Sequence, residues 1–139
     1  MNKIRVVIDT NVLHAGLYSS RGASYKVLRA IEHGRIRIAL STTLLFEYED
    51  ILKRHQSILD LSDREIEELL DDLCKCSDHQ KIYFLWRPQL PDPKDDHILE
   101  LAVAAGTTLI VTHNIKDFEK TEAFGIRAVT PRQLLEEIE

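Results

Sequence analysis

Ile4-Arg5-Val6-Val7-Ile8-Asp9-Thr10-Asn11 places an aspartate directly after a short, strongly apolar run. The run predicts a strand that is buried on both faces, as the inner strands of parallel α/β sheets are. Asp9 then lies at the carboxyl end of the strand, where open α/β sheets bind their ligands. An ionised carboxylate at such a place needs a cation, a hydrogen-bond network or a catalytic task. The rest of the chain must therefore supply partners for Asp9.

The composition limits the class of protein. A length of 139 residues with 44% hydrophobic and 29% charged residues predicts one soluble domain over residues 1–139. We expect a cytoplasmic protein with no membrane contact, because no apolar stretch reaches the length of a membrane span and no signal peptide opens the chain. The net charge of −5 gives no general attraction to nucleic acid. Local basic groups or metal ions must therefore meet any phosphate-bearing partner.

Short apolar runs alternate with helical patterns along the chain. Strands are expected over residues 4–8, 36–40, 82–85, 108–111 and 126–129. Helices are expected over residues 23–33, 42–55, 63–76, 95–105 and 131–138, the third opened by a capping box at Ser62 and Glu65. This alternation predicts an α/β fold with a mostly parallel sheet of about five strands and helices on both faces.

Two pairs of neighbouring acids offer partners for Asp9. On the helix over 95–105, Asp95 shares the apolar face and Asp96 lies about 100° further round, towards solvent. Asp95 is thus the better site residue and Asp96 the better partner of the helix dipole, although simple capping would explain both. On the helix over 42–55, Glu47 and Glu49 flank the apolar stripe equally, so helix geometry does not choose between them.

A polar segment follows the strand expected over residues 108–111. Thr112-His113-Asn114-Ile115-Lys116-Asp117 begins at the ligand side of a parallel sheet, where Asn114 and Asp117 could reach a metal ion or a phosphate. The alternative is a turn stabilised by these two residues. Together with Asp9 and Asp95, these oxygens predict a site for Mg²⁺ or Mn²⁺, which would activate water and neutralise phosphate oxygens.

Basic and aromatic side chains allow two interpretations each. His113 and Lys116 either contact phosphate or belong to a solvated loop. Tyr83, Phe84 and Trp86 either lie in the core or at a hydrophobic interface, which is the expectation, or are platforms on which bases stack. Five cations either form a basic rim beside the site or are dispersed surface charge: Arg21, Lys26, Lys53, Arg54 and Lys94.

In the order and spacing of these motifs the chain resembles PIN-domain proteins, specifically the single-domain, VapC-like ribonucleases that are the toxins of toxin–antitoxin systems. The resemblance covers nearly the whole chain. It rests on residues 6–13, Gly16-Leu17, 21–23, 41–52, 92–102, 110–114 and Thr130-Pro131. It implies a PIN-like three-layer sandwich, in agreement with the α/β fold expected from the alternation.

The resemblance also implies roles for individual residues. Asp9, Glu47 and Asp95 correspond to the family's acidic metal ligands, which selects Glu47 over Glu49. The fourth acidic position is occupied by Asn114, which offers an oxygen but no charge, and Asp117 is near enough in sequence to compensate. Asn11 is expected to brace the Asp9 loop. Thr10 and Thr112 are expected to donate hydrogen bonds around the ligands, with Asp96 as a further supporting residue.

The function implied is a Mg²⁺- or Mn²⁺-dependent endoribonuclease that leaves a 5′-phosphate and a 3′-hydroxyl. The expected partners are an RNA substrate, a small antitoxin protein and a second copy of the chain in a homodimer. One alternative is a catalytically degenerate PIN module that binds RNA or protein, suggested by Asn114. Another is a haloacid-dehalogenase-like phosphohydrolase, but that chemistry requires an aspartate where this chain has Asn11.

Overall fold

The computed structural model describes residues 4–82 and 90–138 and contains a five-stranded parallel sheet in the order β3-β2-β1-β4-β5. The apolar runs at the start of the chain and after Gly34 form two of its inner strands, as predicted. The strands are β1 (Ile4–Ile8), β2 (Ile36–Leu40), β3 (Ser77–His79), β4 (Leu109–Val111) and β5 (Arg127–Val129).

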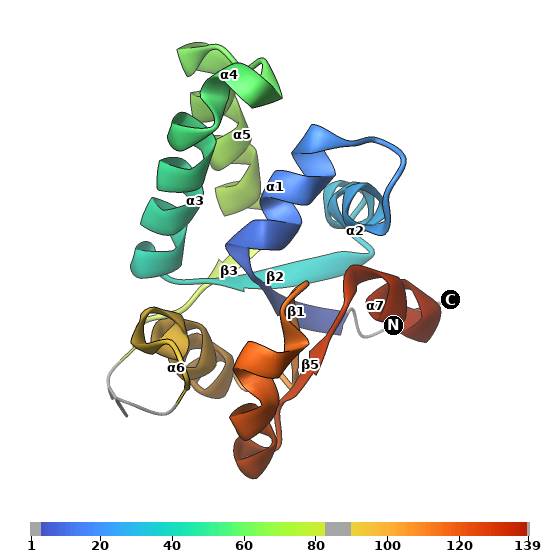
Figure 1. Ribbon diagram of the computed structural model, residues 1–139, viewed down its shortest axis with the longest axis vertical. Coiled ribbons are helices and arrows are strands. Elements are labelled where there is room, and N and C mark those ends of the chain that lie inside the picture. Colours follow the sequence, from blue (N-terminus) through green and yellow to red (C-terminus); the bar gives the residue numbers. More distant parts are fainter. Residues whose placement is uncertain (1–3, 83–89, 139) are drawn as a thin grey trace.

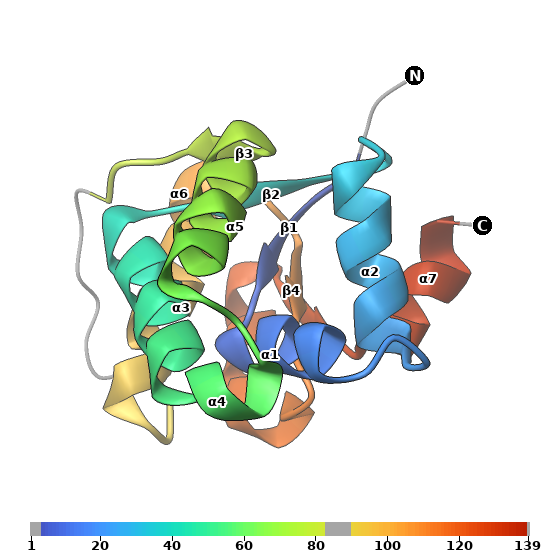
Figure 2. The same cartoon turned by 90° about the horizontal axis from the view of Figure 1, so that it is seen from above.

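Helices cover both faces of the sheet, which gives the three layers expected of an α/β sandwich (Figures 1 and 2). The first group comprises α1 (Thr10–Tyr18), α2 (Ala23–Glu32), α3 (Thr42–Arg54), α4 (Gln56–Leu59) and α5 (Asp63–Lys75). The opposite face carries α6 (Asp96–Ala105), preceded by the short 3₁₀ helix η1 (Pro93–Asp95), and the 3₁₀ segment η2 (Ile115–Phe124). The last helix, α7 (Pro131–Ile138), packs against α2 and β5.

The strand order places a topological switch point between β1 and β4. The chain leaves β1 towards β2 through the helices of one face, and it reaches β4 and β5 through those of the other. Ile8 pairs with Val111, so the residues that follow them, Asp9 and Thr112, lie side by side at the carboxyl edge. Open α/β sheets bind ligands at this kind of crevice.

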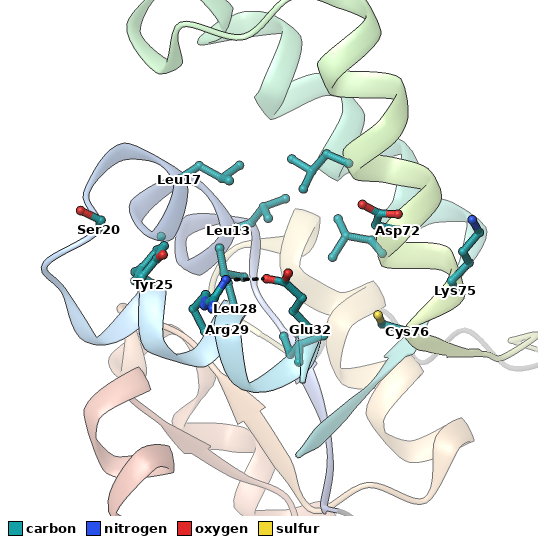
Figure 3. A pocket seen from close by; sticks show the side chains of 14 residues that line it. Leu13, Leu17, Ser20, Tyr25, Leu28, Arg29, Glu32, Asp72, Lys75 and Cys76 are labelled. Carbon is teal, nitrogen blue, oxygen red and sulfur yellow. Dashed lines mark hydrogen bonds and ion pairs between the residues drawn. The ribbon is translucent and has the colours of Figure 1, made fainter. Parts of the chain in front are cut away.

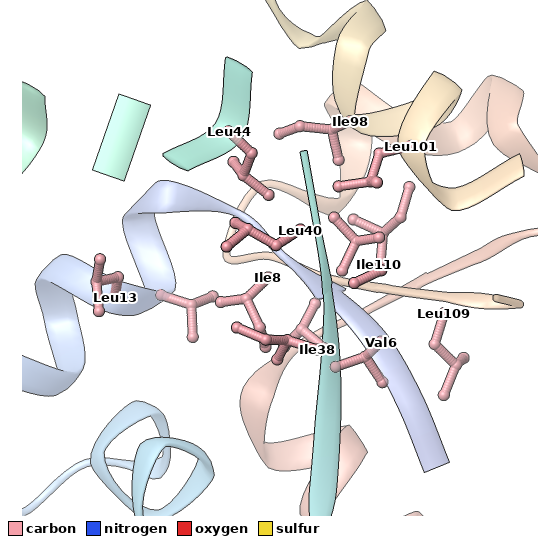
Figure 4. Close-up of a cluster of buried hydrophobic side chains, with 14 of the residues drawn as sticks. Val6, Ile8, Leu13, Ile38, Leu40, Leu44, Ile98, Leu101, Leu109 and Ile110 are labelled. Atoms are coloured by element: carbon pink, nitrogen blue, oxygen red, sulfur yellow. The ribbon is translucent and has the colours of Figure 1, made fainter. Parts of the chain in front are cut away.

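The core fills the space between the sheet and its helices. Figure 4 shows Ile8, Ile38 and Leu40 from the two central strands meeting Leu44 of α3 and Ile98 of α6. These side chains are at most 2% exposed, and burying each contributes on the order of 1.5–3 kcal/mol to folding. The strands that carry the carboxyl edge are therefore fixed on both faces.

Gly16 allows α1 and α2 to approach each other closely. A Cβ atom at this position would lie 2.5 Å from Cδ1 of Leu28 on α2. The glycine therefore sets how tightly α1, the helix that begins beside Asp9, packs on its neighbour.

The strand predicted over residues 82–85 was misplaced where the structure describes it. Ile82 lies in no strand, and residues 83–85 lie outside the described residues, as do Tyr83, Phe84 and Trp86. The strand next to β2 is instead the polar segment Ser77–His79. It is an edge strand held by ion pairs, because Asp78 accepts hydrogen bonds from both Arg37 and Arg5. An apolar pattern does not reveal such a strand.

The predicted helices are all present, with ends that differ by at most one residue. The capping box is confirmed, since Ser62 accepts from the Glu65 backbone and Glu65 accepts from that of Ser62. Along the described chain, four helical segments were not predicted: α1, α4, η1 and η2. The first of them begins directly at Asp9, which is its N-cap residue.

Candidate active site

Asp9 is held at the carboxyl edge by hydrogen bonds to both of its oxygens. Its Oδ1 accepts from the backbone N–H of Thr10 at 2.8 Å, and its Oδ2 accepts from the Thr112 hydroxyl at 2.8 Å. The side chain is nearly buried, with 8% of its surface exposed. Burial raises the pKa of Asp9, although the Thr112 and Thr10 hydrogen bonds oppose this shift. The carboxylate is thus fixed in position and only partly compensated in charge.

Asn11 links the β1 and β4 ends of the edge. Its side-chain N–H group lies 3.3 Å from Oδ2 of Asp9 and 3.4 Å from the Thr112 hydroxyl, and its oxygen accepts from the backbone of His113. Thr112 also accepts from the backbone N–H of Asn114. Thr112 thus contributes its hydroxyl to the network, whereas Thr10 contributes its backbone N–H.

Asp95 lies at the start of α6 in a strongly negative environment. Its pKa is raised to about 6 by partial burial and by the charges of Asp9, Asp92, Asp117 and Glu47. These charges come from segments that are far apart in the sequence. The fold therefore brings the predicted carboxylates into one electrostatically coupled group.

Replacing Asp95 with asparagine is expected to stabilise the metal-free protein at pH 7. The pKa of Asp95 is about 6 in the folded chain, against 3.8 for an unperturbed aspartate. Between these two pH values the folded state binds more protons than the unfolded state, so the free energy of unfolding falls as the pH rises from about 4 to about 6. The expected gain is about 1 kcal/mol, since the group is half-exposed and screened by solvent. Urea unfolding in EDTA at pH 7 and pH 4 measures it.

The gain should disappear near pH 4, where Asp95 is protonated in the folded wild type. Asparagine is also an accepted residue at a helix start, and Asp95 makes no side-chain cap hydrogen bond that the variant would lose. An Asp95→Asn protein that is less stable than the wild type at pH 7 would contradict the idea that burial and neighbouring negative charges make the ionised Asp95 side chain unfavourable.

Asp96 does not point to solvent, and this prediction was wrong. The residue is fully buried, and its Oδ1 accepts from the backbone N–H of Leu90 at 2.9 Å. Every residue from Asp96 to Ala102 is buried, so the first two turns of α6 have no solvent face. The helical wheel failed because it assumes one exposed side. Asp96 anchors the segment before η1.

Replacing Asp96 with alanine should lower the free energy of unfolding by about 1–3 kcal/mol, because the Leu90 N–H group would be left buried without its acceptor. Asp96→Asn keeps an acceptor oxygen and is the matched variant, with a smaller expected loss. Urea unfolding at pH 7 measures both. Equal stability of the alanine variant and the wild type would show that this hydrogen bond does not hold the segment.

Glu47 lies at the site, and Glu49 lies away from it. Oε1 of Glu47 is 2.9 Å from Nε2 of His97, a close polar contact whose geometry is not that of an aligned hydrogen bond. The charge of Glu47 also raises the pKa of both Asp9 and Asp95. Glu49 instead forms an exposed pair with Lys53 at 3.4 Å. The geometry thus separates two residues that the helical wheel left equivalent.

His97 was missed by sequence reasoning. It is 4% exposed, and a proton on its ring would act to lower the pKa of Asp9. A histidine that follows two aspartates at the start of an apolar helix is a usable signal, since a buried ring nitrogen requires a polar partner. His97 lies between α6 and the Glu47 side chain of α3, and therefore helps to set where that carboxylate points.

Asn114 and Asp117 are placed differently. Asp117 is half-buried, and its charge acts on Asp95. Asn114 is exposed and joins the network through its backbone N–H. Nε2 of His113, the residue before Asn114, lies 2.8 Å from the hydroxyl of Ser24 on α2. The loop after β4 is therefore tied both to Asp9 and to α2.

The donor set suits a hard divalent cation in its chemistry. Carboxylate oxygens are the ligands that Mg²⁺ and Mn²⁺ prefer, and a cation would relieve the repulsion that raises the pKa of Asp95. Within residues 4–82 and 90–138, however, no three Asp, Glu, His or Cys side chains are grouped closely enough to hold a metal ion. The fit therefore rests on charge and ligand type rather than on coordination distances.

A large cavity lies away from the candidate site. It has a volume of about 640 Å³ and lies between α1, α2 and α5, where Leu13, Leu17 and Leu28 point into it (Figure 3). None of the candidate site residues lines it. As for membranes, no described helix combines the length and the apolar character that crossing a bilayer requires.

Comparison with known proteins identifies a family. The family model of the PIN domain matches residues 5–116. The match includes Asp9, Glu47 and Asp95 and ends at the second residue of η2. No curated protein matches the sequence.

Proposed function

The chain belongs to the PIN-domain family, and from this premise we propose that it is a divalent-metal-dependent endoribonuclease. PIN domains are generally nucleases, so the chain has a nuclease-type fold. The observation that carries the proposal is the coupling of Asp9, Glu47 and Asp95, which come from three separate elements. Burial raises the pKa of Asp95 to about 6, and the charges of Asp9, Asp92, Asp117 and Glu47 contribute to the shift.

The proposed roles follow from the surroundings of each carboxylate. A divalent ion bound among these oxygens would activate water and neutralise charge on a phosphodiester. Asp9 would be the fixed ligand, since hydrogen bonds from Thr10 and Thr112 orient it. Glu47 would be oriented by His97. Asp117 would add negative charge on the side where Asn114 has none.

The test is cleavage of a panel of structured and single-stranded RNAs by the purified protein. We expect cleavage in Mg²⁺ or Mn²⁺, none in EDTA, and products with a 5′-phosphate and a 3′-hydroxyl. Cleavage that persists in EDTA at the same rate would overturn the metal-dependent mechanism. A covalent phosphate on Asp9 would instead favour the phosphohydrolase alternative, for which family membership gives no support.

A second candidate is a PIN module that binds RNA or protein without cleaving it. Two observations favour it: Asn114 provides no fourth carboxylate, and the described acidic side chains are not grouped at coordination distance. Binding of RNA with no cleavage in either metal would support this function over the nuclease.

The physiological role proposed is that of a toxin restrained by a small antitoxin, acting as a homodimer in the cytoplasm. The support is the resemblance to single-domain toxins, and the free thiols Cys74 and Cys76 suit a reducing compartment. Growth arrest on expression, relieved by the product of a neighbouring short gene, would test this role.

A further inference from the structure

A basic groove lies between α2 and α7. The two helices run side by side (Figures 1 and 2), and a cavity of about 490 Å³ separates part of their surfaces. Its charged lining is Lys26, Arg29, Arg35 and Arg132 with the single acid Glu136, and His33 also lines it. The chain as a whole has 18 basic and 23 acidic residues. Positive charge is therefore concentrated in this groove, although the chain as a whole has a net charge of −5.

The cations of the groove are available to a ligand. All four are exposed, and along the described chain neither Lys26 nor Arg35 forms an ion pair. Arg29 pairs with Glu32 and Arg132 with Glu136 only across exposed surface, and such pairs contribute little and exchange easily for other anions.

The groove begins at the carboxyl edge of the sheet, where α2 contacts the loop that follows β4. Ala23 lines its start, and the adjacent Ser24 contacts His113 of the loop that follows β4. The helix α7 begins directly after β5, so both helices start at this edge and both direct their positive dipole ends towards it. From there α2 extends over ten residues, or about 15 Å, to the groove's far end near Arg35.

The charges of the site and the groove are opposite in sign. The carboxylates around Asp9 repel phosphate, so a polyanion that reaches them must be held by cations nearby. Lys53 and Arg54 lie in the last turn of α3, away from the carboxyl edge where that helix begins, and neither lines the groove. The cations of the groove begin with Lys26, about one helical turn after Ala23.

We infer that the groove between α2 and α7 binds the phosphate backbone of single-stranded RNA that extends from the carboxylate site. This inference rests on the proposed function for the identity of the polyanion. The contacts are to phosphate and carry no base specificity, so they position the strand and raise its affinity without selecting a sequence.

The test measures binding of a fluorescein-labelled 15-nucleotide single-stranded RNA by anisotropy, in EDTA and over a range of KCl concentrations. The groove variant combines Lys26→Gln, Arg35→Gln and Arg132→Gln. The matched control combines Lys53→Gln, Arg54→Gln and Arg64→Gln, which removes the same charge from exposed positions on α3 and α5. Unfolding midpoints of all proteins are compared first.

The groove variant is expected to bind at least about 10-fold more weakly at 0.1 M KCl. Its slope of log affinity against log salt should be smaller by about 2, since each lost phosphate contact to a single strand removes about 0.7. The control variant should change the affinity less than about 3-fold. Equal losses in both variants, or no loss in the groove variant, would overturn the inference.

Two further outcomes separate the groove from the nuclease proposal. Groove-dependent RNA binding with no cleavage in Mg²⁺ or Mn²⁺ would retain the groove and overturn the proposed enzyme. Metal-dependent cleavage, together with RNA binding that is unchanged in the groove variant, would retain the proposed enzyme and overturn the groove. Groove-dependent binding of polyglutamate in place of RNA would overturn the inference in favour of an acidic protein partner.

Discussion

Replacing Asp9 with asparagine is expected to reduce metal-dependent RNA cleavage by at least about 1,000-fold, because a bound ion supplies several kcal/mol of transition-state stabilisation and each tenfold corresponds to about 1.4 kcal/mol. Asparagine is close to aspartate in size and keeps an oxygen that can accept from Thr10. The measurement is the initial rate of cleavage of one RNA from the panel, in Mn²⁺ and at fixed pH.

The fold should survive this substitution, which makes the activity loss interpretable. Burial raises the pKa of Asp9, so removing its charge relieves a desolvation cost while the Thr112 contact is weakened. We expect Mn²⁺ to raise the unfolding temperature of the wild type and not that of the variant, since an ion that binds only the folded state stabilises it. A variant that cleaves at the wild-type rate would remove Asp9 from the site.

The sequence was sufficient where one physical pattern dominates a segment. Apolar, β-branched runs located β1 and β2 to the residue, and the reciprocal capping of Ser62 and Glu65 located the start of α5. The same logic failed at β3, where Asp78 is held by Arg37 of the adjacent strand β2 and by Arg5 of β1 beyond it. Such pairing depends on which strands are neighbours, and that is a property of the tertiary structure.

The site was predictable in outline, for a similar reason. Residues that directly follow parallel strands meet at one edge whatever the detail of the loops, so Asp9 and Thr112 could be brought together from strand positions alone. Asp96 could not be judged, because its burial depends on the segment before η1 folding over the helix start. His97 could not be linked to Glu47 without knowing that α3 and α6 are in contact.

Replacing Glu47 with glutamine is expected to reduce cleavage by about 100-fold or more, whereas Glu49→Gln should change it less than about 2-fold. The two residues lie on the same helix, and each substitution removes one negative charge and keeps the length of the side chain. Any effect of net charge on RNA binding is therefore equal in the two variants. Only Glu47 contacts His97 and acts on the charges of Asp9 and Asp95.

The comparison also separates metal binding from fold stability. Glu49 is tied to Lys53 on the surface, and losing such a pair costs at most about 0.5 kcal/mol. In the Glu47→Gln protein, the Mn²⁺ concentration that gives half-maximal cleavage should rise, because one charged ligand becomes a neutral amide. Equal losses in the two variants would mean that α3 contributes charge in general rather than a ligand at a defined position. If Glu47 is a metal ligand, the difference in cleavage rate between the two variants should grow as the Mn²⁺ concentration is lowered.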